Sequence, residues 1–399
     1  MMTATLVPLD ESELRRRRSL KWCRTAPDTV PFDIAEADFA VAEPVRDTIV
    51  SLSNRSDLGY PDFDSPRGGP ARLAELFSAR TFSRYRVPVD PARVEICAQI
   101  MQALCCALLA FSAPGDHVLT HTPTYPPIRE AVRKLGRRLI VIDAFGSADE
   151  ERFAGTNSLS DSIKMIILCQ PHNPTGRIFE HGELKFLAEI AERDGAVIFA
   201  DEIHQDLGFD KPHESIASID AAHARTILFT SAAKSFNIAG LRCATGYFGS
   251  SELHTRFRSL PWHLRGGAGV LGIEATITAW SECDDWLEDF RSRLRENRDL
   301  IFTELAKCPK GAITAIEPDA TYFAWLGIED ISTRPDNSPT ERLRPAFQPG
   351  SLFGEVFSGH IRLNFATTPE RVLLALAELR ELINAPDCAP LRSTNTPKE

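Results

Sequence analysis

Short runs of apolar and β-branched residues recur along the first two thirds of the chain and alternate with longer amphipathic stretches. The runs lie at residues 94–97, 117–120, 139–142, 165–168, 196–199 and 226–229, and helical patterns lie at residues 127–135 and 182–194. Nearly continuous apolar strands that alternate with amphipathic helices are typical of a mostly parallel sheet with helices on both faces. The pattern therefore predicts a doubly wound α/β domain.

The pattern changes in the last third of the chain. Residues 286–305 carry apolar side chains at helical spacing among many charges, which predicts one long amphipathic helix. Strand patterns at residues 321–326 and 361–365 and a helical pattern at residues 369–382 follow it. This order predicts a smaller α+β domain. Residues 331–345, rich in Pro, Arg, Asp and Ser, predict a surface loop.

These patterns divide the chain into four parts. We expect an N-terminal segment, residues 1–55, that packs on the small domain, and a large domain over residues 56–285. The small C-terminal domain then covers residues 286–385, and residues 386–399 form a flexible tail.

Charge and apolar content exclude several classes of partner. The 399 residues include 45 Lys and Arg against 55 Asp and Glu, a net charge of −10. Nucleic acids and anionic membranes attract clustered positive charge, so we expect neither as a partner. The one basic run, Arg15 to Arg18, is interpreted as the solvated face of a short helix. The longest apolar stretch, residues 103–111, is about half the length that a membrane span needs.

The cysteines indicate a reducing compartment. Nine cysteines are an odd number, and they form neither a CxxC motif nor a paired metal-ligand spacing. We therefore expect reduced thiols in a cytoplasmic protein, and no metal site.

Polar residues follow three of the predicted strands at the points where the strands end. Residues 170–176 read QPHNPTG, residues 201–204 read DEIH, and residues 230–242 include a lysine at 234 and an arginine at 242. Ligands collect at the carboxyl ends of strands in such sheets. Each motif alone is more often a turn or a solvated lysine, so the combination carries the argument.

In this order and at these strand ends, the motifs resemble those of fold-type I pyridoxal 5′-phosphate (PLP) enzymes, the aspartate aminotransferase superfamily. The resemblance extends from about residue 34 to residue 382. It implies PLP as the cofactor. It also implies a large doubly wound domain with a mostly parallel seven-stranded sheet and a smaller α+β C-terminal domain.

The resemblance gives roles to the residues around the cofactor. Lys234 would form the Schiff base with PLP and, once freed, act as the general acid and base at the substrate Cα, with a pKa depressed by burial. Asp201 would keep the pyridine nitrogen protonated, and Asn173 would hydrogen-bond the ring 3′-oxygen. Ser231 and Arg242 would bind the phosphate.

Further cofactor contacts follow from the same resemblance. The backbone N–H groups of Ile100 and Met101, at a predicted helix start, would bind phosphate, and Tyr125 would stack on the ring. Tyr60 matches the tyrosine that reaches the phosphate of the neighbouring subunit. Tyr60 and Tyr125 thus join Lys234 in the implied catalytic set, and an obligate homodimer with shared active sites is implied.

The resemblance implies a small-molecule amino-acid substrate, most often a cysteine S-conjugate in the lyase branch, that is held by its carboxylate. Arg362 matches the bidentate carboxylate-binding arginine, assisted by Asn173 and by the backbone of Ala35. Candidates for the side-chain pocket are Trp262, His263 and Arg265.

Local motifs favour one reaction without excluding others. His204 in the DEIH motif resembles the C–S lyase branch, the cystathionine β-lyase relatives, which eliminate a thiol from a cysteine S-conjugate and leave pyruvate and ammonia. Two residues depart from that branch: Ala233 stands where a serine is common, and Arg242 resembles a phosphate-binding arginine of aminotransferases that many C–S lyases lack. Transamination of an L-amino acid and a decarboxylating or oxidatively deaminating reaction therefore remain open, as does a regulatory binding protein with a degenerate pocket. His204 either acts as an acid or replaces a tyrosine's hydrogen bond to the cofactor.

Overall fold

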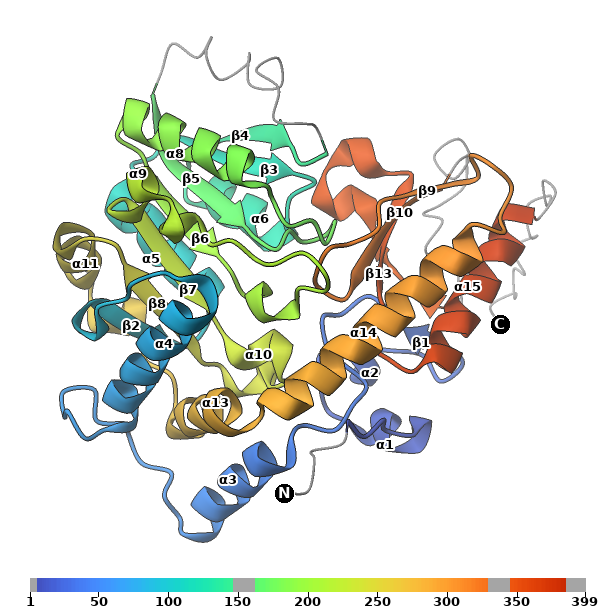
Figure 1. The fold of residues 1–399 in the computed structure, drawn as a ribbon, viewed down its shortest axis with the longest axis horizontal. Helices are drawn as coiled ribbons and strands as arrows, with labels where there is room; N and C mark the ends of the chain where they lie inside the picture. Colours follow the sequence, from blue (N-terminus) through green and yellow to red (C-terminus); the bar gives the residue numbers. More distant parts are fainter. Residues whose placement is uncertain (1–5, 146–161, 329–344, 385–399) are drawn as a thin grey trace, which may run out of the picture.

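The computed structural model describes residues 6–145, 162–328 and 345–384 (Figure 1). The predicted loop at residues 331–345 falls outside the described residues except for its last position, and the predicted tail at residues 386–399 also lies outside them. Within the described ranges, no helix is both long and apolar enough to cross a membrane.

A seven-stranded sheet forms the larger part of the molecule. Its strands lie in the order β2 (Val94–Cys97), β8 (Ala244–Phe248), β7 (Thr226–Thr230), β6 (Val197–Asp201), β5 (Ile163–Cys169), β3 (His117–Thr122) and β4 (Arg138–Asp143). β8 runs antiparallel to both of its neighbours, and the other pairs are parallel. The predicted mostly parallel seven-stranded sheet is confirmed. β8 was not among the predicted strands, because Gly246 interrupts its short apolar pattern.

Helices cover both faces of this sheet (Figure 1). On one face the core includes side chains from α5 (Ile100–Phe111) and α6 (Pro126–Lys134), and on the other face it includes side chains from α8 (His181–Asp194). Successive residues of β5 alternate between these cores, Ile167 facing α5 and Ile166 facing α8. Both faces of the strands are therefore buried, as the continuous apolar runs predicted.

The smaller part contains a four-stranded antiparallel sheet. Its strand order is β12 (Gln348–Pro349), β13 (His360–Asn364), β10 (Phe323–Ile328) and β9 (Ile313–Ala315). The long helix α14 (Asp284–Leu305) and the helix α15 (Pro369–Asn384) pack against each other beside it (Figure 1). The predicted long helix is confirmed, with its start two residues earlier than expected. β10 begins at Phe323 because Thr321 adopts a left-handed backbone conformation, φ 72°.

The N-terminal residues contact both parts of the molecule. Short helices α1 (Glu11–Arg16) and α2 (Leu20–Cys23) precede β1 (Val30–Pro31), which pairs in parallel with β11 (Pro345–Ala346) near the small sheet. By contrast, α3 (Glu43–Asn54) and α4 (Gly69–Tyr85) pack on α13 (Val270–Glu282). Residues 1–55 therefore do not pack on the small sheet alone, and the domain boundaries at residues 55, 285 and 385 stay a prediction.

The basic run near the N-terminus differs from its interpretation. α1 ends at Arg16, and the backbone of Arg17 is extended, with φ −63° and ψ 143°. The Arg17 guanidinium donates to the carbonyls of Ala37 at 3.2 Å and Phe39 at 3.1 Å. The prediction of a single solvated helical face is therefore wrong for Arg17, because tertiary contacts bind its side chain to the body of the protein.

Candidate active site

One cavity of about 780 Å³ opens at the carboxyl ends of β5, β6 and β7. The end of β5 contributes Cys169, the end of β6 contributes Asp201, and the residue after β7 is Ser231. Parallel strands bring their carboxyl ends to one edge, so residues far apart in sequence meet there. Eleven predicted site residues line the cavity: Ala35, Ile100, Met101, Tyr125, Asn173, Asp201, His204, Ser231, Lys234, Arg242 and Arg362.

Lys234 lies on a short helix, α10 (Ala232–Ser235), directly after β7. Ser231 caps this helix, because its hydroxyl oxygen accepts a hydrogen bond from the Ala233 N–H at 3.1 Å. The Lys234 amine is half-buried and donates to the Ala35 carbonyl at 3.1 Å. Burial, and then the charge of Arg362, lower the pKa of Lys234 to about 8. An amine with this pKa exchanges protons readily near neutral pH.

Asp201 is buried at the end of β6, next to Cys169 in the sheet register. Its carboxylate accepts a hydrogen bond from the Ile203 N–H at 3.2 Å. Burial raises the pKa of Asp201 to about 6, although the Ile203 N–H and the Lys234 charge oppose the shift. Among the described residues no Lys, Arg or His forms an ion pair with this buried carboxylate, which suits it to pair with a cationic group bound in the cavity.

Arg362 and Asn173 meet across the cavity from β13 and the loop after β5. The Arg362 guanidinium donates to the Asn173 side-chain oxygen at 2.9 Å and to the Asp33 carbonyl at 2.6 Å, and it also hydrogen-bonds the Gln348 side chain. It lies over the Phe323 ring, 4.0 Å from the centroid. Burial lowers the pKa of Arg362 to about 10.

The Arg362 guanidinium retains capacity for an anion. Its Nε is buried without a hydrogen-bond partner, and within the described ranges no carboxylate forms an ion pair with it. Oxygen atoms of neighbouring residues hold this buried guanidinium in place without neutralising its charge. It is therefore suited to bind the carboxylate of a ligand.

The opposite side of the cavity carries donors suited to a phosphate. α5 begins at Ile100 with Gln99 as its N-cap, so the predicted helix start is confirmed, and Ile100 and Met101 line the cavity at this end. Arg242 is exposed and hydrogen-bonds the Gln99 side chain. The Ser231 hydroxyl donates to the Cys243 carbonyl at 2.5 Å.

Two aromatic or imidazole rings complete the cavity wall. Tyr125 is the N-cap of α6, and burial raises the pKa of its phenol. His204 is buried against the rings of Tyr322 and Phe323, with centroids 5.7 and 5.6 Å away. Burial, reinforced by the charges of Lys234 and Arg362, lowers the pKa of His204 well below its ordinary value. A neutral imidazole at this position favours a hydrogen-bonding role over that of an acid.

Four predicted residues lie outside this cavity. Tyr60 is fully exposed and makes no contribution to the cavity of its own chain. Trp262 and His263 are exposed on α12 (Trp262–Arg265), and Arg265 is buried in an ion pair with Glu95 at 3.0 Å. Trp262, His263 and Arg265 do not line the cavity of their own chain, so their place in a side-chain pocket stays a prediction.

Comparison with known proteins agrees with this geometry. A model of the family described as aminotransferase class I and II matches residues 27–379. The chain belongs to the aminotransferase class I and II family. The resemblance drawn from the strand-end motifs is thereby confirmed.

Relatives within this family include both lyases and aminotransferases. A cystathionine β-lyase of Corynebacterium glutamicum is 29% identical over 376 residues, which cover 93% of this chain and 98% of that protein. An aspartate aminotransferase of Thermotoga maritima is 23% identical over 384 residues, 95% of this chain and 98% of that protein. A candidate PLP-dependent β-cystathionase of Corynebacterium diphtheriae has a solved structure with a TM-score of 0.86 and 28% identity, covering 95% and 99% of the two chains.

Sequence reasoning assigned no site role to three residues in or next to the cavity: Gln348, Tyr322 and Glu36. Gln348 lies beside Arg362 only because β12 pairs with β13, and Tyr322 donates its hydroxyl to the Ala35 carbonyl at 3.2 Å. Glu36 lines the cavity, and its charge partly restores the pKa of Lys234. Each of these contacts joins segments far apart in the chain, so no local pattern could reveal it.

Proposed function

We propose that this protein is a PLP-dependent C–S lyase that eliminates a thiol from a cysteine S-conjugate. The observation that carries the proposal is the convergence of Lys234, Asp201, Asn173 and Arg362 in one cavity. The similarity to a cystathionine β-lyase over nearly the whole chain supports the choice of reaction.

The residues present fit the cofactor. Asp201 would hold the pyridine nitrogen, because a carboxylate whose pKa burial has raised is stabilised by a bound cation. Asn173 and Tyr125 would contact the ring, and Ser231, Arg242 and the start of α5 would hold the phosphate. When bound, PLP supplies an electron sink that stabilises negative charge at the substrate Cα.

The chain's own residues would then bind the substrate and move its protons. Arg362 binds the substrate carboxylate through its fork of N–H donors. The Lys234 amine removes the Cα proton, since a pKa of about 8 leaves part of the population neutral near neutral pH. The Cβ–S bond breaks with its electron pair on sulfur, and the proton that Lys234 took from Cα passes to the sulfur to complete the thiol. Hydrolysis of the remaining three-carbon unit gives pyruvate and ammonia.

A homodimer with shared active sites is part of this proposal. The fully exposed Tyr60 supports it, because the ring contributes nothing to the cavity of its own chain and is free to contact a partner. Tyr60 would reach the phosphate held in the partner's cavity.

A cytoplasmic location is also proposed, supported by the eight free cysteines among the described residues.

The alternative reaction is transamination of an L-amino acid. The aspartate aminotransferase relative and the exposed Arg242 beside the start of α5 favour it. Both reactions need the same base and carboxylate site, so the cavity residues named above do not separate them. A decarboxylating or oxidatively deaminating reaction on an S-cysteine conjugate would also begin in this cavity.

One assay separates these reactions. The holoenzyme is incubated with S-substituted cysteine, with and without an added keto acid, while thiol, pyruvate and ammonia are measured. Thiol and pyruvate in equal amounts without a keto acid are expected. Turnover that strictly requires the keto acid would replace the proposal by transamination, and release of carbon dioxide or peroxide would indicate the third reaction.

A further inference from the structure

Residues 33–39 form a segment that we call the strap, and its residues 34–36 line the cavity. Every backbone carbonyl of the strap accepts at least one hydrogen bond. The donors come from the N-terminal residues, the large sheet region and the small sheet region: Arg362 to Asp33, Asn364 to Ile34 and Glu36, Lys234 and Tyr322 to Ala35, Lys21 to Glu36, Arg17 and Asn237 to Ala37 and Phe39, and Leu9 to Asp38. The strap is therefore fixed at every residue.

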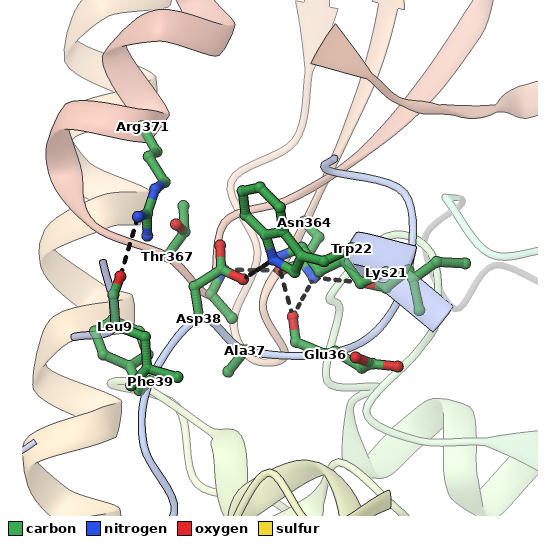
Figure 2. Close-up of polar contacts among 12 residues, drawn as sticks. Leu9, Lys21, Trp22, Glu36, Ala37, Asp38, Phe39, Asn364, Thr367 and Arg371 are labelled. Carbon is green, nitrogen blue, oxygen red and sulfur yellow. Dashed lines mark hydrogen bonds and ion pairs between the residues drawn. The ribbon is translucent and has the colours of Figure 1, made fainter. Parts of the chain in front are cut away.

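A buried ion pair lies at the centre of these contacts (Figure 2). The Lys21 ammonium is 3.0 Å from the Asp38 carboxylate, and both side chains are 1% exposed. The Trp22 indole N–H donates to the same carboxylate oxygen at 2.8 Å. α2 is thereby joined to the strap by two neighbouring side chains that point at one carboxylate.

The ion pair also holds the part of the strap that enters the cavity. Lys21 donates to the Glu36 carbonyl at 3.2 Å, and Asn364 donates to the same oxygen at 2.9 Å (Figure 2). The preceding carbonyl, that of Ala35, accepts from the Lys234 amine. Lys21 and Lys234 thus bind adjacent carbonyls of one short backbone segment, although they lie far apart in the sequence.

We propose that the buried Lys21–Asp38 pair positions the Lys234 amine for the reaction by fixing the strap carbonyl that this amine contacts. The pair never touches the substrate, so both residues are positioning residues. The inference rests on the proposed function in giving Lys234 the role of the base.

General physical arguments favour positioning over stability alone as the role of this pair. An isolated buried ion pair is often no more stabilising than apolar side chains of similar volume, because desolvation offsets the attraction. Its directional hydrogen bonds nevertheless specify one geometry. A small displacement of a reacting group slows a reaction strongly, so fixing Ala35 has a direct kinetic consequence.

The test replaces the pair as a unit. The double variant Lys21→Met/Asp38→Asn removes both charges, avoids leaving either charge buried alone, and retains an acceptor for Trp22. The matched control is Arg371→Gln, which loses a 3.0 Å hydrogen bond to the Leu9 carbonyl and a contact with the Trp22 ring but leaves the ion pair in place (Figure 2).

The first measurement is steady-state kinetics of the holoenzyme. We expect the double variant to lose on the order of 10-fold to 100-fold in kcat, because the base is misplaced. KM should rise as well, because Arg362 donates to the Asp33 carbonyl of the same strap. The isotope effect of Cα deuteration on kcat should increase. Arg371→Gln should lower the unfolding temperature and leave kcat unchanged.

The second measurement needs no turnover. The full-length chain without cofactor is labelled with acetic anhydride across a pH series, and mass spectrometry follows the peptide that contains Lys234. The charged or titratable groups near its amine include Arg362, Arg242, Glu36, Asp201 and His204, together with Tyr322, which donates to the same Ala35 carbonyl. Neither substitution replaces any of them. Loss of the carbonyl acceptor disfavours the protonated amine, so the labelling pKa should fall below the value of about 8 in the unaltered chain.

The outcomes are distinct. A folded double variant with unaltered kcat and labelling pKa would overturn the inference, as would an Arg371→Gln variant with the same kinetic loss as the double variant. A labelling shift in a protein that releases no thiol from any S-substituted cysteine would support the positioning role while overturning the proposed elimination.

Discussion

Lys234 and Asp201 have opposite pKa shifts for one physical reason. Burial disfavours the charged form of each group, which lowers the pKa of the amine to about 8 and raises the pKa of the carboxyl to about 6. A bound cofactor with a cationic ring nitrogen would favour the ionised form of Asp201. The two shifts therefore describe a cavity ready for a charged ligand.

The raised pKa of Asp201 predicts how cofactor stabilisation depends on pH. Its contribution to folding is fully present below the unfolded pKa of 3.8 and is lost as pH rises through about 6. PLP pairing should recover this loss, so the increase in Tm on adding PLP should be larger near pH 8 than near pH 5. Calorimetry at both pH values checks this.

Asp201→Asn serves as the control for that experiment. Formation of the Schiff base between PLP and the lysine amine is itself favoured at higher pH. Only the part of the pH dependence of Tm that disappears in Asp201→Asn therefore belongs to the carboxylate. An unaltered pH dependence in this variant would contradict the assignment.

Replacing Lys234 tests the role of the base. Lys234→Ala should lose the visible absorbance of lysine-bound PLP, and thiol release should fall by about 10³-fold or more, because no amine remains to move the Cα proton. Lys185→Ala, on the exposed face of α8, is the matched control and should behave as the unaltered protein. Equal absorbance in both variants would exclude Lys234 as the attachment point.

Arg362 offers a test of carboxylate binding. Arg362→Lys retains a charge but loses the planar fork, so kcat/KM for an S-substituted cysteine should fall by about 10²-fold. The matching S-substituted cysteamine lacks the carboxylate, and its slow turnover should be equal in both proteins. A parallel loss for both compounds would indicate a general defect instead.

At the scale of elements, the loop after β5 depends on one glycine. Gly176 adopts φ +71°, and a Cβ there would lie 2.3 Å from the Cβ of Pro318 and 2.8 Å from the Ala320 carbonyl. This close approach to the segment before β10 fixes the loop that carries Asn173. The glycine of the NPTG motif therefore has a steric explanation.

Two glycine substitutions separate conformational strain from steric overlap. Gly195 ends α8 with φ +67° and has open space around its Cβ position, so Gly195→Ala should cost roughly 1 kcal/mol. Gly176→Ala combines the same strain with steric overlap, so it should lower the free energy of unfolding by roughly 3 kcal/mol and weaken the binding of PLP. Chemical denaturation measures both, and equal losses would show that the overlap is relieved at no cost.

At the scale of the whole molecule, the exposed Tyr60 predicts complementation between subunits. In the proposed shared site, Lys234→Ala and Tyr60→Ala would alter residues that come from different chains. A hybrid dimer should therefore contain one intact site and one doubly altered site. Since one of its two sites works, it should have up to about half of the activity of an unaltered dimer. Mixing the variants after reversible dissociation and measuring thiol release tests this. Activity that never exceeds that of either parent would place Tyr60 outside the site.

Local sequence determined much of this architecture. Both faces of the central strands are buried, so these strands are nearly continuously apolar, and six of the seven were predictable from the pattern of apolar runs. The polar residues that interrupt these patterns at strand ends marked Asn173, Asp201 and Lys234, because parallel strands bring their carboxyl ends to one edge. The strand β8, which runs antiparallel to its neighbours in the seven-stranded sheet, was not predictable because its apolar pattern is weak.

Only the tertiary structure decided how the distant segments meet. Gln348, Tyr322, Lys21 and Asp38 act through contacts that join residues far apart in the chain, and the sequence does not show which residues they contact. Folding also decided that Arg17 holds the strap and that Arg265 pairs with Glu95. The periodicity of apolar residues indicates which face of a helix or strand is buried. The partner of a buried polar group depends instead on the packing of the whole chain.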